Sequence, residues 1–380
     1  MKIALVRARY NPFGGAERFA ARAMQALASQ KVTVTIIARS WKAQGAGSLR
    51  FLRCDPFYLG STWRDWSFAR AVRRLVENEH FDLVQSHERI PGLAIYRAGD
   101  GVHAAWLARR STQAGFWKRC AIQLNLHHRY LLRVERTLFE HPDLRAVICN
   151  STLVRDEIAT RFRIEAQKLV LIRNGVDLDY FAPAACDAHR ETIRNTLAIP
   201  LGAMVFVFVG SGFERKGLAS ALNALAYLPA NCHLIVVGGD KRQNHYEALA
   251  RAQGILGRTH FVGEVTNPLP YYAAADTFVL PSIYDPFPNA VLEALACGVP
   301  VITSDGCGAK DVISENENGW IIESGDIAAL AACMQRVSQD MCNVTKAQAL
   351  RQAARSSVEG YGTEALGQAL LDLYARLGVA

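Results

Sequence analysis

The sequence contains no uninterrupted apolar run near the roughly 20 residues that a membrane-spanning helix requires. It also lacks low-complexity tracts and internal repeats, which excludes a disordered polymer or a collagen. Its nine cysteines are scattered singly, without a CxxC pair or Cys/His ligand spacing. We therefore expect reduced cytosolic thiols, mostly buried, and no structural zinc site. The opening MKIALVRARY is broken by Arg7 and Arg9, so we expect a first core strand there and not a signal peptide.

What the sequence does contain is enough apolar material for a large core. Of its 380 residues, 50% are hydrophobic and 21% are charged, and at about 150 residues per domain this length predicts two domains. The 43 basic and 35 acidic residues give a net charge of +8. This surplus favours an anionic partner, namely a nucleotide, a phosphorylated substrate, nucleic acid or an acidic membrane surface. The charge alone does not choose among them.

Short β-branched runs alternate with amphipathic segments, which predicts parallel α/β layers. The predicted strands are Lys2–Val6, Val32–Ala38, Leu83–Ser86, Ala146–Cys149, Met204–Val209, His233–Val237, His260–Val262, Thr277–Leu280 and Val299–Thr303. The predicted helices are Ala16–Ser29, Leu153–Phe162, Leu218–Leu228, Tyr246–Gln253, Ala290–Ala296 and Thr363–Gly378. The fold class is thus α/β, with two Rossmann-like doubly wound domains.

The strand series restarts near residue 204, after a segment with two prolines and no strong period. We predict a first domain over 1–172, an interdomain connection over 173–200, a second domain over 201–360 and a C-terminal helix over 361–380. Doubly wound sheets bind ligands where strand carboxyl ends and helix amino ends converge. A ligand is therefore expected at that edge.

Two glycine-rich segments each follow the first strand of a series. In Asn11–Glu17, Gly14 and Gly15 permit close backbone approach to a ligand, although an ordinary tight turn would use them equally. In Gly210–Gly217, Arg215 and Lys216 suit a diphosphate, because a guanidinium grips two oxygens and an ammonium adds a compact charge. We expect this pair at a helix start. The helix dipole disfavours cations there, so an anionic ligand explains them better than a solvated surface pair does.

The most specific segment is DPFPNAVLEA, residues 285–294. Asp285 is expected in a loop at a strand end, and Glu293 one turn inside an otherwise apolar helix. A carboxylate in such surroundings needs a partner, which sugar hydroxyls or an internal salt bridge would supply.

The Asp285-x7-Glu293 spacing, with LEALACGVPVITSD behind it, resembles the signature of the retaining, nucleotide-sugar glycosyltransferases of family 4, which have the GT-B fold. The segments FGGAE, GSGFERKG and RNGVDLDYF match that family in the same order, so the resemblance runs through nearly the whole chain. YNPFGGAER together with IPGLAIYRAGDGVH is closer still to the glucosyltransferases of the lipopolysaccharide core. The resemblance implies two domains facing a central cleft, with the C-terminal helix returning to the first domain.

The resemblance also implies which residues would bind a uridine diphosphate sugar donor. Arg215 and Lys216 would neutralise the diphosphate, Asp285 would face the transferred sugar, and Glu293 would bind the ribose. The remaining donor-side positions are Gly14, Gly15, Arg173, Val265 and the backbone amides of Asn289, Ala290 and Val291. The family usually carries Glu in place of Asp285, and one methylene less shortens the reach toward the sugar. No cofactor or metal is expected, because the two cations can replace one.

On the acceptor side the resemblance points to Asp100, within RAGDGVH, which would orient or deprotonate the attacking hydroxyl. The alternative is an aspartate that only shapes a glycine turn. His87 and His103 are weaker candidates with expected structural roles. Asp100, Arg215, Lys216 and Asp285 are thus the candidate catalytic residues.

Basic and aromatic residues are interleaved in the segment Trp106–Arg136. Such a segment could dock on anionic lipid, bind nucleic acid or form a solvated helix face. We favour the membrane, because the expected acceptor is a lipid-linked core oligosaccharide, and we expect no nucleic-acid partner.

The predicted function is retaining transfer of a hexose, glucose first, to the heptose region of that acceptor on the cytoplasmic face of the inner membrane. Alternatives are another family 4 acceptor (glycolipid, capsule or O-antigen) and a binding module without catalysis.

Overall fold

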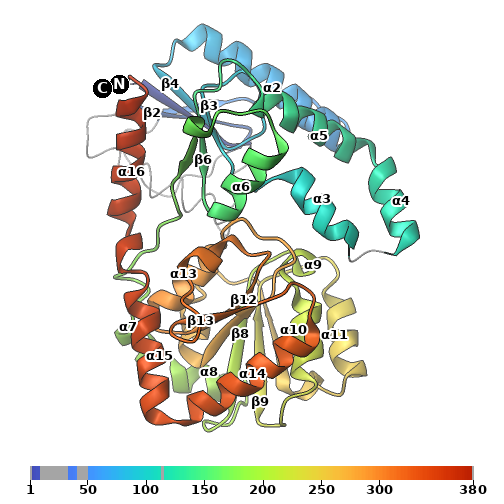
Figure 1. Cartoon of the computed structure of the whole chain (residues 1–380), viewed down its shortest axis with the longest axis vertical. Helices are drawn as coiled ribbons and strands as arrows, with labels where there is room; N and C mark the ends of the chain where they lie inside the picture. The colour runs from blue at the N-terminus through green and yellow to red at the C-terminus, as the bar shows by residue number, and fades with distance from the viewer. Residues whose placement is uncertain (1, 9–32, 41–49, 113–114, 379–380) are drawn as a thin grey trace. The chain divides into compact units, whose positions relative to one another are not determined.

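The computed structural model describes residues 2–8, 33–40, 50–112 and 115–378. These residues form two compact units, one of residues 1–174 and 363–380 and the other of residues 175–362 (Figure 1). The chain passes between the units twice. Within the second unit, a backbone hydrogen bond from the Val176 N–H to the Tyr361 carbonyl (2.8 Å) joins the two segments next to these crossings. The predicted helix Ala16–Ser29 lies outside the described residues.

The first unit is built on a seven-stranded parallel sheet of order β3-β2-β1-β4-β5-β6-β7. Its strands are β1 (Lys2–Val6), β2 (Thr33–Ala38), β3 (Arg50–Arg53), β4 (Leu83–Ser86), β5 (Ile95–Arg97), β6 (Ala146–Cys149) and β7 (Leu169–Leu171). Its described helices are α2 (Gly60–Glu79), α3 (His103–Thr112), α4 (Phe116–Leu124), α5 (Leu126–Phe139), α6 (Thr152–Arg161), the 3₁₀ turn Ala166–Lys168 and α16 (Thr363–Arg376).

Alternate residues of β1 enter the two cores on either side of this sheet, because strand side chains alternate between faces. Ile3 and Leu5 pack in the cluster that contains apolar residues of α16. Ala4 and Val6 pack on the other face with residues of α2. The Tyr374 hydroxyl of α16 also donates to Gln85 Oε1 of β4 at 2.8 Å. The prediction that the C-terminal helix returns to the first unit is confirmed.

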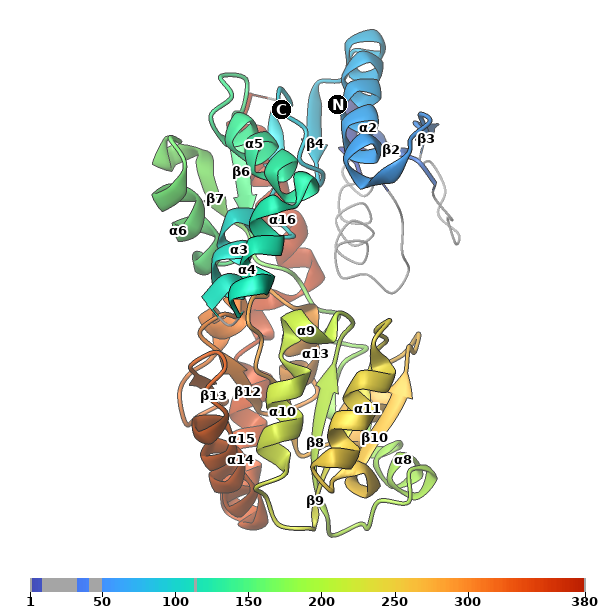
Figure 2. The ribbon, with the colours of Figure 1, turned by 90° about the vertical axis from the view of Figure 1, so that its right-hand side faces the viewer.

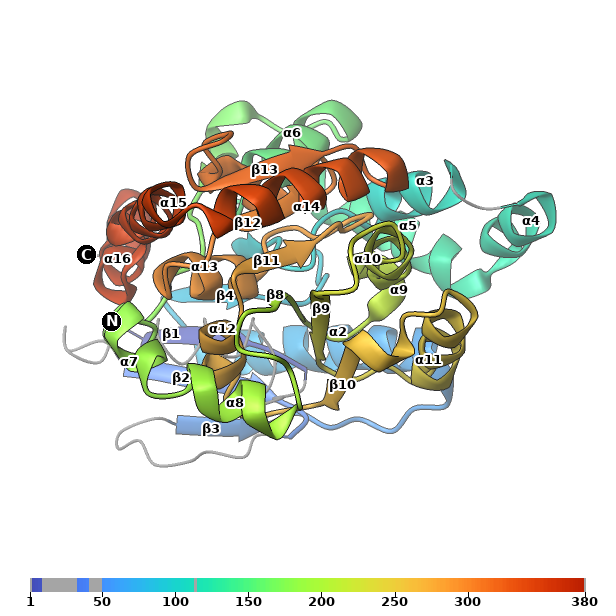
Figure 3. The ribbon, with the colours of Figure 1, turned by 90° about the horizontal axis from the view of Figure 1, so that it is seen from below.

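The second unit contains a six-stranded parallel sheet of order β10-β9-β8-β11-β12-β13. Its strands are β8 (Met204–Val209), β9 (Cys232–Val237), β10 (Thr259–Gly263), β11 (Thr277–Leu280), β12 (Val301–Ser304) and β13 (Gly319–Ile322). Its helices are α7 (Pro183–Asp187), α8 (Arg190–Thr196), α9 (Phe213–Lys216), α10 (Leu218–Leu225), α11 (Gln243–Ala252), α12 (Leu269–Ala274), α13 (Asn289–Ala296), α14 (Ile327–Cys342), α15 (Val344–Ser356) and 3₁₀ turns at Leu256–Arg258, Gly308–Val312 and Glu359–Tyr361. Helices α10 and α11 cover one face of the sheet, and α12 and α13 cover the other (Figure 3).

The segment 173–200, which we expected to be an interdomain connection, carries α7 and α8 and belongs to the second unit from Gly175 onward. A buried arginine attaches this segment to the second unit. Arg194 of α8 donates to Asp276 Oδ2 (2.9 Å) and to three backbone carbonyls of the second unit. Helices of five and seven residues are too short to give a recognisable hydrophobic period.

Candidate functional site

The second unit has a topological switch point between β8 and β11. The connection from β8 leads outward to β9, whereas the connection from β11 leads in the opposite direction to β12. Open α/β sheets bind ligands in the crevice that this reversal leaves at the strand carboxyl ends. Arg215 and Lys216 come shortly after β8, and Asp285 comes shortly after β11. The fold therefore brings three of the candidate catalytic residues to one edge.

Glycines let the chain turn tightly at this edge. Gly210 has φ +146°, and a Cβ there would lie 2.5 Å from Lys216 Cε. Gly217 has φ +77°, and a Cβ there would lie 2.0 Å from the Pro281 carbonyl oxygen. A larger residue at position 217 would therefore push the Arg215–Gly217 segment away from the chain that follows β11, whereas one at position 210 would displace the Lys216 side chain.

We expected Arg215 and Lys216 at a helix start. They end the one-turn helix α9 and directly precede Gly217, the N-cap residue of α10. The dipole of α10 does not stabilise cations at its amino end, whereas it would stabilise an anionic ligand there. The pair therefore lies at the start of α10, close to the switch point.

Asp285 lies against both cations. Lys216 Nζ donates to Asp285 Oδ2 at 2.6 Å, and Arg215 Nη2 lies 3.9 Å from the same oxygen. Burial alone would raise the pKa of Asp285, but the neighbouring Lys216 and Arg215 charges and the hydrogen bonds to the carboxylate hold it below its usual value. The side chains of Lys216 and Asp285 are 10% and 6% exposed, whereas that of Arg215 is 37% exposed. Arg215 is thus the cation that a ligand reaches most directly.

Glu293 lies one turn inside α13 and is buried. The Tyr272 hydroxyl of α12 donates to Glu293 Oε2 at 3.1 Å, so part of its hydrogen-bonding need is met inside the protein. At the amino end of the same helix, Asn289 and Val291 are buried and Ala290 is half-buried. The Val291 N–H donates to the Pro288 carbonyl at 3.2 Å. An anion at this helix end would have to compete with that bond.

The remaining predicted site residues lie on other segments of the two units. Val265 follows β10 and packs on the core of the second unit, and Arg173 is a half-buried residue of the first unit. Gly14 and Gly15 lie outside the described residues. Asp100 follows β5 in the first unit, with its side chain 53% exposed and Oδ2 3.8 Å from Arg7 Nη1.

Each of the two candidate histidines contacts another side chain of the first unit. His87 is buried beside Gln85, whose amide lies 3.1 Å from its ring. His103 lies 3.2 Å from the His128 ring. Burial, reinforced by the Arg89 charge, lowers the pKa of His103 to about 3, so this imidazole is neutral at physiological pH.

The sequence reasoning missed Arg7 and Glu88, which lie at the switch point of the first unit. Arg7 directly follows β1, Glu88 comes two residues after β4, and these strands are neighbours in the sheet. Both residues could have been found in the sequence as charged residues that closely follow predicted strands. In the described part of the chain, no group of three His, Cys, Asp or Glu side chains is placed to hold a metal, and no helix is long and apolar enough to cross a membrane.

Two family models match consecutive parts of the chain. The model for glycosyl transferases group 1 covers residues 189–357, and the model for glycosyltransferase family 4 covers residues 13–180. The chain is a glycosyltransferase, with a family 4 domain followed by a group 1 domain. Lipopolysaccharide glucosyltransferase WaaG of Escherichia coli K12 is 26% identical to this glycosyltransferase over 326 residues, which are 85% of each chain.

Solved structures show the same fold. The crystal structure of WaaG superimposes with a TM-score of 0.84 at 24% identity, over 98% of this chain and 99% of that one. Anabaena HepE, solved in complex with UDP-glucose, gives a TM-score of 0.75 at 18% identity, over 99% of this glycosyltransferase and 100% of HepE. The predicted GT-B fold, with two parallel Rossmann-like sheets, is confirmed.

Proposed function

We propose that this glycosyltransferase moves a hexose, glucose first, from a UDP-sugar to the heptose region of a lipopolysaccharide core acceptor, with retention at the anomeric carbon. The observation that carries the proposal is the Arg215–Lys216–Asp285 cluster at the switch point of the second unit. The relation to WaaG over 85% of both chains supports the acceptor class, and the fold shared with HepE supports a UDP-sugar donor.

In this proposal the second unit binds the donor through charge. Arg215 and Lys216 stabilise the negative charge that grows on the diphosphate as the nucleotide leaves, which is the task a metal performs in other transferases. Glu293 accepts hydrogen bonds from the ribose hydroxyls, and Asp285 faces the transferred sugar. Val265, Arg173 and the amides at the start of α13 complete the donor side, and Asp100 orients the acceptor or takes its proton.

The experiment is a transfer assay with the purified full chain. UDP-, GDP- and ADP-sugars are offered with a core acceptor that lacks its first outer hexose, and the anomeric configuration of the product is read by NMR. We expect transfer from UDP-glucose, an α-linked product, and an unchanged rate in the presence of EDTA. In a deletion strain, the core mass profile should end before the first outer hexose. An unchanged core would contradict the acceptor assignment and favour another glycolipid, capsule or O-antigen.

We also propose that the segment Trp106–Arg136 holds the enzyme on the anionic cytoplasmic surface of the inner membrane. Its helix α4 lies at the outer end of α5, away from the sheet of its unit (Figures 1 and 3). Phe116 and Trp117, with side chains 70% and 83% exposed, stack edge to face on α4 at 5.4 Å. Leu124, at the end of α4, and Leu126, at the start of α5, are exposed as well. Exposed aromatic and apolar groups beside arginines suit the interface of an acidic bilayer.

Neutralising Arg109, Arg110, Lys118 and Arg119 together should release the protein from anionic vesicles, because each basic residue near such a surface contributes about 1 kcal/mol. Replacing Phe116 and Trp117 by serine should weaken binding in high salt as well, since apolar contact is not screened. Vesicle sedimentation at low and high salt measures both. Tyr227→Ser, an exposed aromatic residue of the second unit, is the control. Equal binding to neutral and anionic vesicles would contradict the proposal.

A further inference from the structure

A cavity of about 730 Å³ lies entirely within the second unit. Its walls come from α7, the start of α8, α12, the segment after α13 and one face of α15, which Figure 3 shows together at one side of the unit. This volume lies within the range of about 300–1,000 Å³ that is typical of small-molecule sites. The cavity is not lined by any of this unit's charged donor residues, Arg215, Lys216, Asp285 and Glu293.

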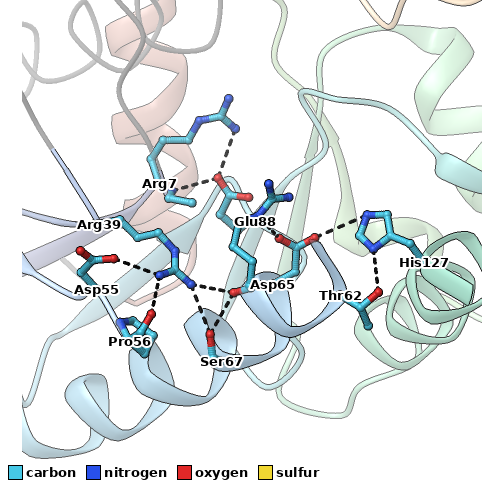
Figure 4. Close-up of polar contacts among 11 residues, drawn as sticks. Arg7, Arg39, Asp55, Pro56, Thr62, Asp65, Ser67, Glu88 and His127 are labelled. Carbon is cyan, nitrogen blue, oxygen red and sulfur yellow. Dashed lines mark hydrogen bonds and ion pairs between the residues drawn. The ribbon is translucent and has the colours of Figure 1, made fainter. Parts of the chain in front are cut away.

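The cavity at the switch point of the first unit provides a comparison for its charge. That cavity, of about 360 Å³, is lined by Arg7 and Arg39 among other residues. Arg7 Nη1 lies 3.5 Å from Glu88 Oε1, and Arg39 Nη1 donates to Asp55 Oδ1 at 3.1 Å (Figure 4). Because these two guanidinium groups face different carboxylates, each positive charge is offset by a negative charge of its own.

In the second unit, by contrast, three arginines share one carboxylate. Asp276 Oδ1 accepts from Arg190 Nη2 (2.5 Å) and from Arg351 Nη2 (3.2 Å). Asp276 Oδ2 accepts from Arg194 Nη2 and from the Val205 N–H, both at 2.9 Å. A carboxylate has about four acceptor positions, so these donors saturate it. Its one negative charge offsets only one of the three positive charges in this group.

This excess of positive charge reaches the cavity. Burial, reinforced by the Arg190 and Arg351 charges, lowers the pKa of Arg194 although Asp276 acts in the opposite direction. Arg194 is 1% exposed, whereas Arg190 and Arg351, with side chains 34% and 36% exposed, line the cavity. An anion bound to Arg190 and Arg351 would therefore offset the repulsion among the three guanidinium groups.

Two of the lining arginines are also held by backbone carbonyls. Arg190 Nη1 donates to the Ala275 carbonyl at 3.0 Å, just after α12. Arg355 Nη1 donates to the Ala296 carbonyl at 3.0 Å, at the end of α13, and to the Phe181 carbonyl at 2.9 Å. These bonds fix the two guanidinium groups before any ligand arrives, which reduces the entropy that binding would cost.

Helix α15 offers groups for the rest of a ligand. Its lining residues follow the i, i+3, i+4, i+7, i+8 pattern of a single helix face, namely Gln348, Arg351, Gln352, Arg355 and Ser356. The amides and the hydroxyl both donate and accept hydrogen bonds, as sugar hydroxyls require. A bare phosphate would use only the arginines, whereas a phosphorylated sugar would use this whole face.

We propose that this cavity binds a small phosphorylated ligand of the sugar-phosphate class, with its phosphate on Arg190 and Arg351 and its hydroxyl groups on the amides of α15. Guanidinium groups match the geometry of a phosphate, because they donate two parallel N–H bonds. Tyr272 lines the cavity and also donates to Glu293, so the cavity adjoins the candidate donor site without sharing its charged residues. The inference goes beyond the proposed function and does not depend on it.

The test is calorimetric titration of the full chain, without donor, by mannose 6-phosphate, inorganic phosphate and methyl mannoside. We expect mannose 6-phosphate to bind more tightly than inorganic phosphate, and the neutral glycoside to bind least. Arg351→Gln should weaken mannose 6-phosphate binding at least about tenfold, the loss expected for one charge-assisted hydrogen bond. Asp276 then keeps its bonds from Arg190, Arg194 and the Val205 N–H, so the fold should persist.

A second variant, Gln352→Glu, adds a carboxylate to the lining face of α15 and removes no arginine. It should also weaken mannose 6-phosphate binding, through charge repulsion, and glutamate suits a helix. Gln335→Glu on α14 and Arg251→Gln on α11 are the matched controls, because both positions are exposed and neither lines the cavity. Helix α11 lies on the opposite side of the unit from α15 (Figures 2 and 3).

Three outcomes would overturn the inference: mannose 6-phosphate bound no more tightly than the neutral glycoside, equal binding by wild type, Arg351→Gln and Gln352→Glu, or binding that Arg215→Ala abolishes. The last would place the phosphate in the donor site. Inorganic phosphate bound as tightly as mannose 6-phosphate would contradict the sugar part. Thermal melting of each variant verifies the fold. Failure of the proposed function has a different signature, namely no transfer from any UDP-sugar while these titrations are unchanged.

Discussion

Replacing Arg215 by alanine should lower kcat about 100-fold or more, with a smaller effect on donor KM. The charge that Arg215 faces grows as the diphosphate leaves, so its contact is stronger in the transition state than in the ground state. Arg215 is also more exposed than Lys216, and its removal leaves the 2.6 Å Lys216–Asp285 bond in place. Initial-rate kinetics with UDP-glucose measure the effect. Arg251→Ala, which removes an exposed arginine of α11, is the control for net charge.

Lys216→Ala should lower both activity and stability. Removing one partner of a buried ion pair leaves the other charge uncompensated, which costs on the order of 3–5 kcal/mol. Adding Asp285→Asn should recover part of that loss in chemical denaturation without restoring turnover. Normal turnover by both Arg215→Ala and Lys216→Ala would mean that the diphosphate binds elsewhere.

Glu293→Gln should weaken UDP binding about tenfold, equivalent to about 1.4 kcal/mol, whereas Asp285→Asn should mainly change the choice of sugar. A carboxylate that accepts hydroxyl hydrogen bonds loses an acceptor oxygen on amidation and gains a donor that can clash. Asp285→Asn should leave UDP affinity unchanged or higher, because Lys216 then loses its closest carboxylate. Calorimetry with UDP and rates with several UDP-sugars separate these effects.

Tyr272→Phe is the matched variant for Glu293. It removes only the hydroxyl that donates to Glu293 Oε2 at 3.1 Å, so it should give a loss of UDP affinity smaller than that of Glu293→Gln. Equal loss of UDP affinity in Glu293→Gln and Asp285→Asn would refute the division of roles between ribose and transferred sugar.

The buried strands could be read from the sequence because they are continuous apolar runs. The prediction of β1 at Lys2–Val6 was confirmed without a shift, and that of β8 at Met204–Val209 likewise. Four strands were missed: β13, a short apolar segment of sequence GWII, and three others that lack a longer apolar run. β3 is an edge strand of sequence RFLR with two arginines, and β5 and β7 have only three residues each. Pairing with a neighbouring strand, and not local sequence, makes such segments β-strands.

The partners of the charged site residues could not be predicted from the sequence, for a different reason. Glu293 was expected to need a partner, and an internal contact was an open alternative, but only the packing of α12 against α13 identifies Tyr272 as its donor, 21 residues away. The same holds for Lys216 and Asp285, which are 69 residues apart. Separation along the chain carries no information about which charges meet at a sheet edge.

The sequence by itself determined the α/β class and the two strand series, and the resemblance of its motifs to those of known glycosyltransferases indicated that class of enzyme. These properties depend on local composition, periodicity and short motifs. Only the tertiary structure decided that α7 and α8 belong to the second unit, that Lys216 and Asp285 bind each other, and that Arg7 and Glu88 flank a cavity. Each of these depends on strand order, because the reversal of direction between β1 and β4, and between β8 and β11, brings together side chains that are distant in the chain.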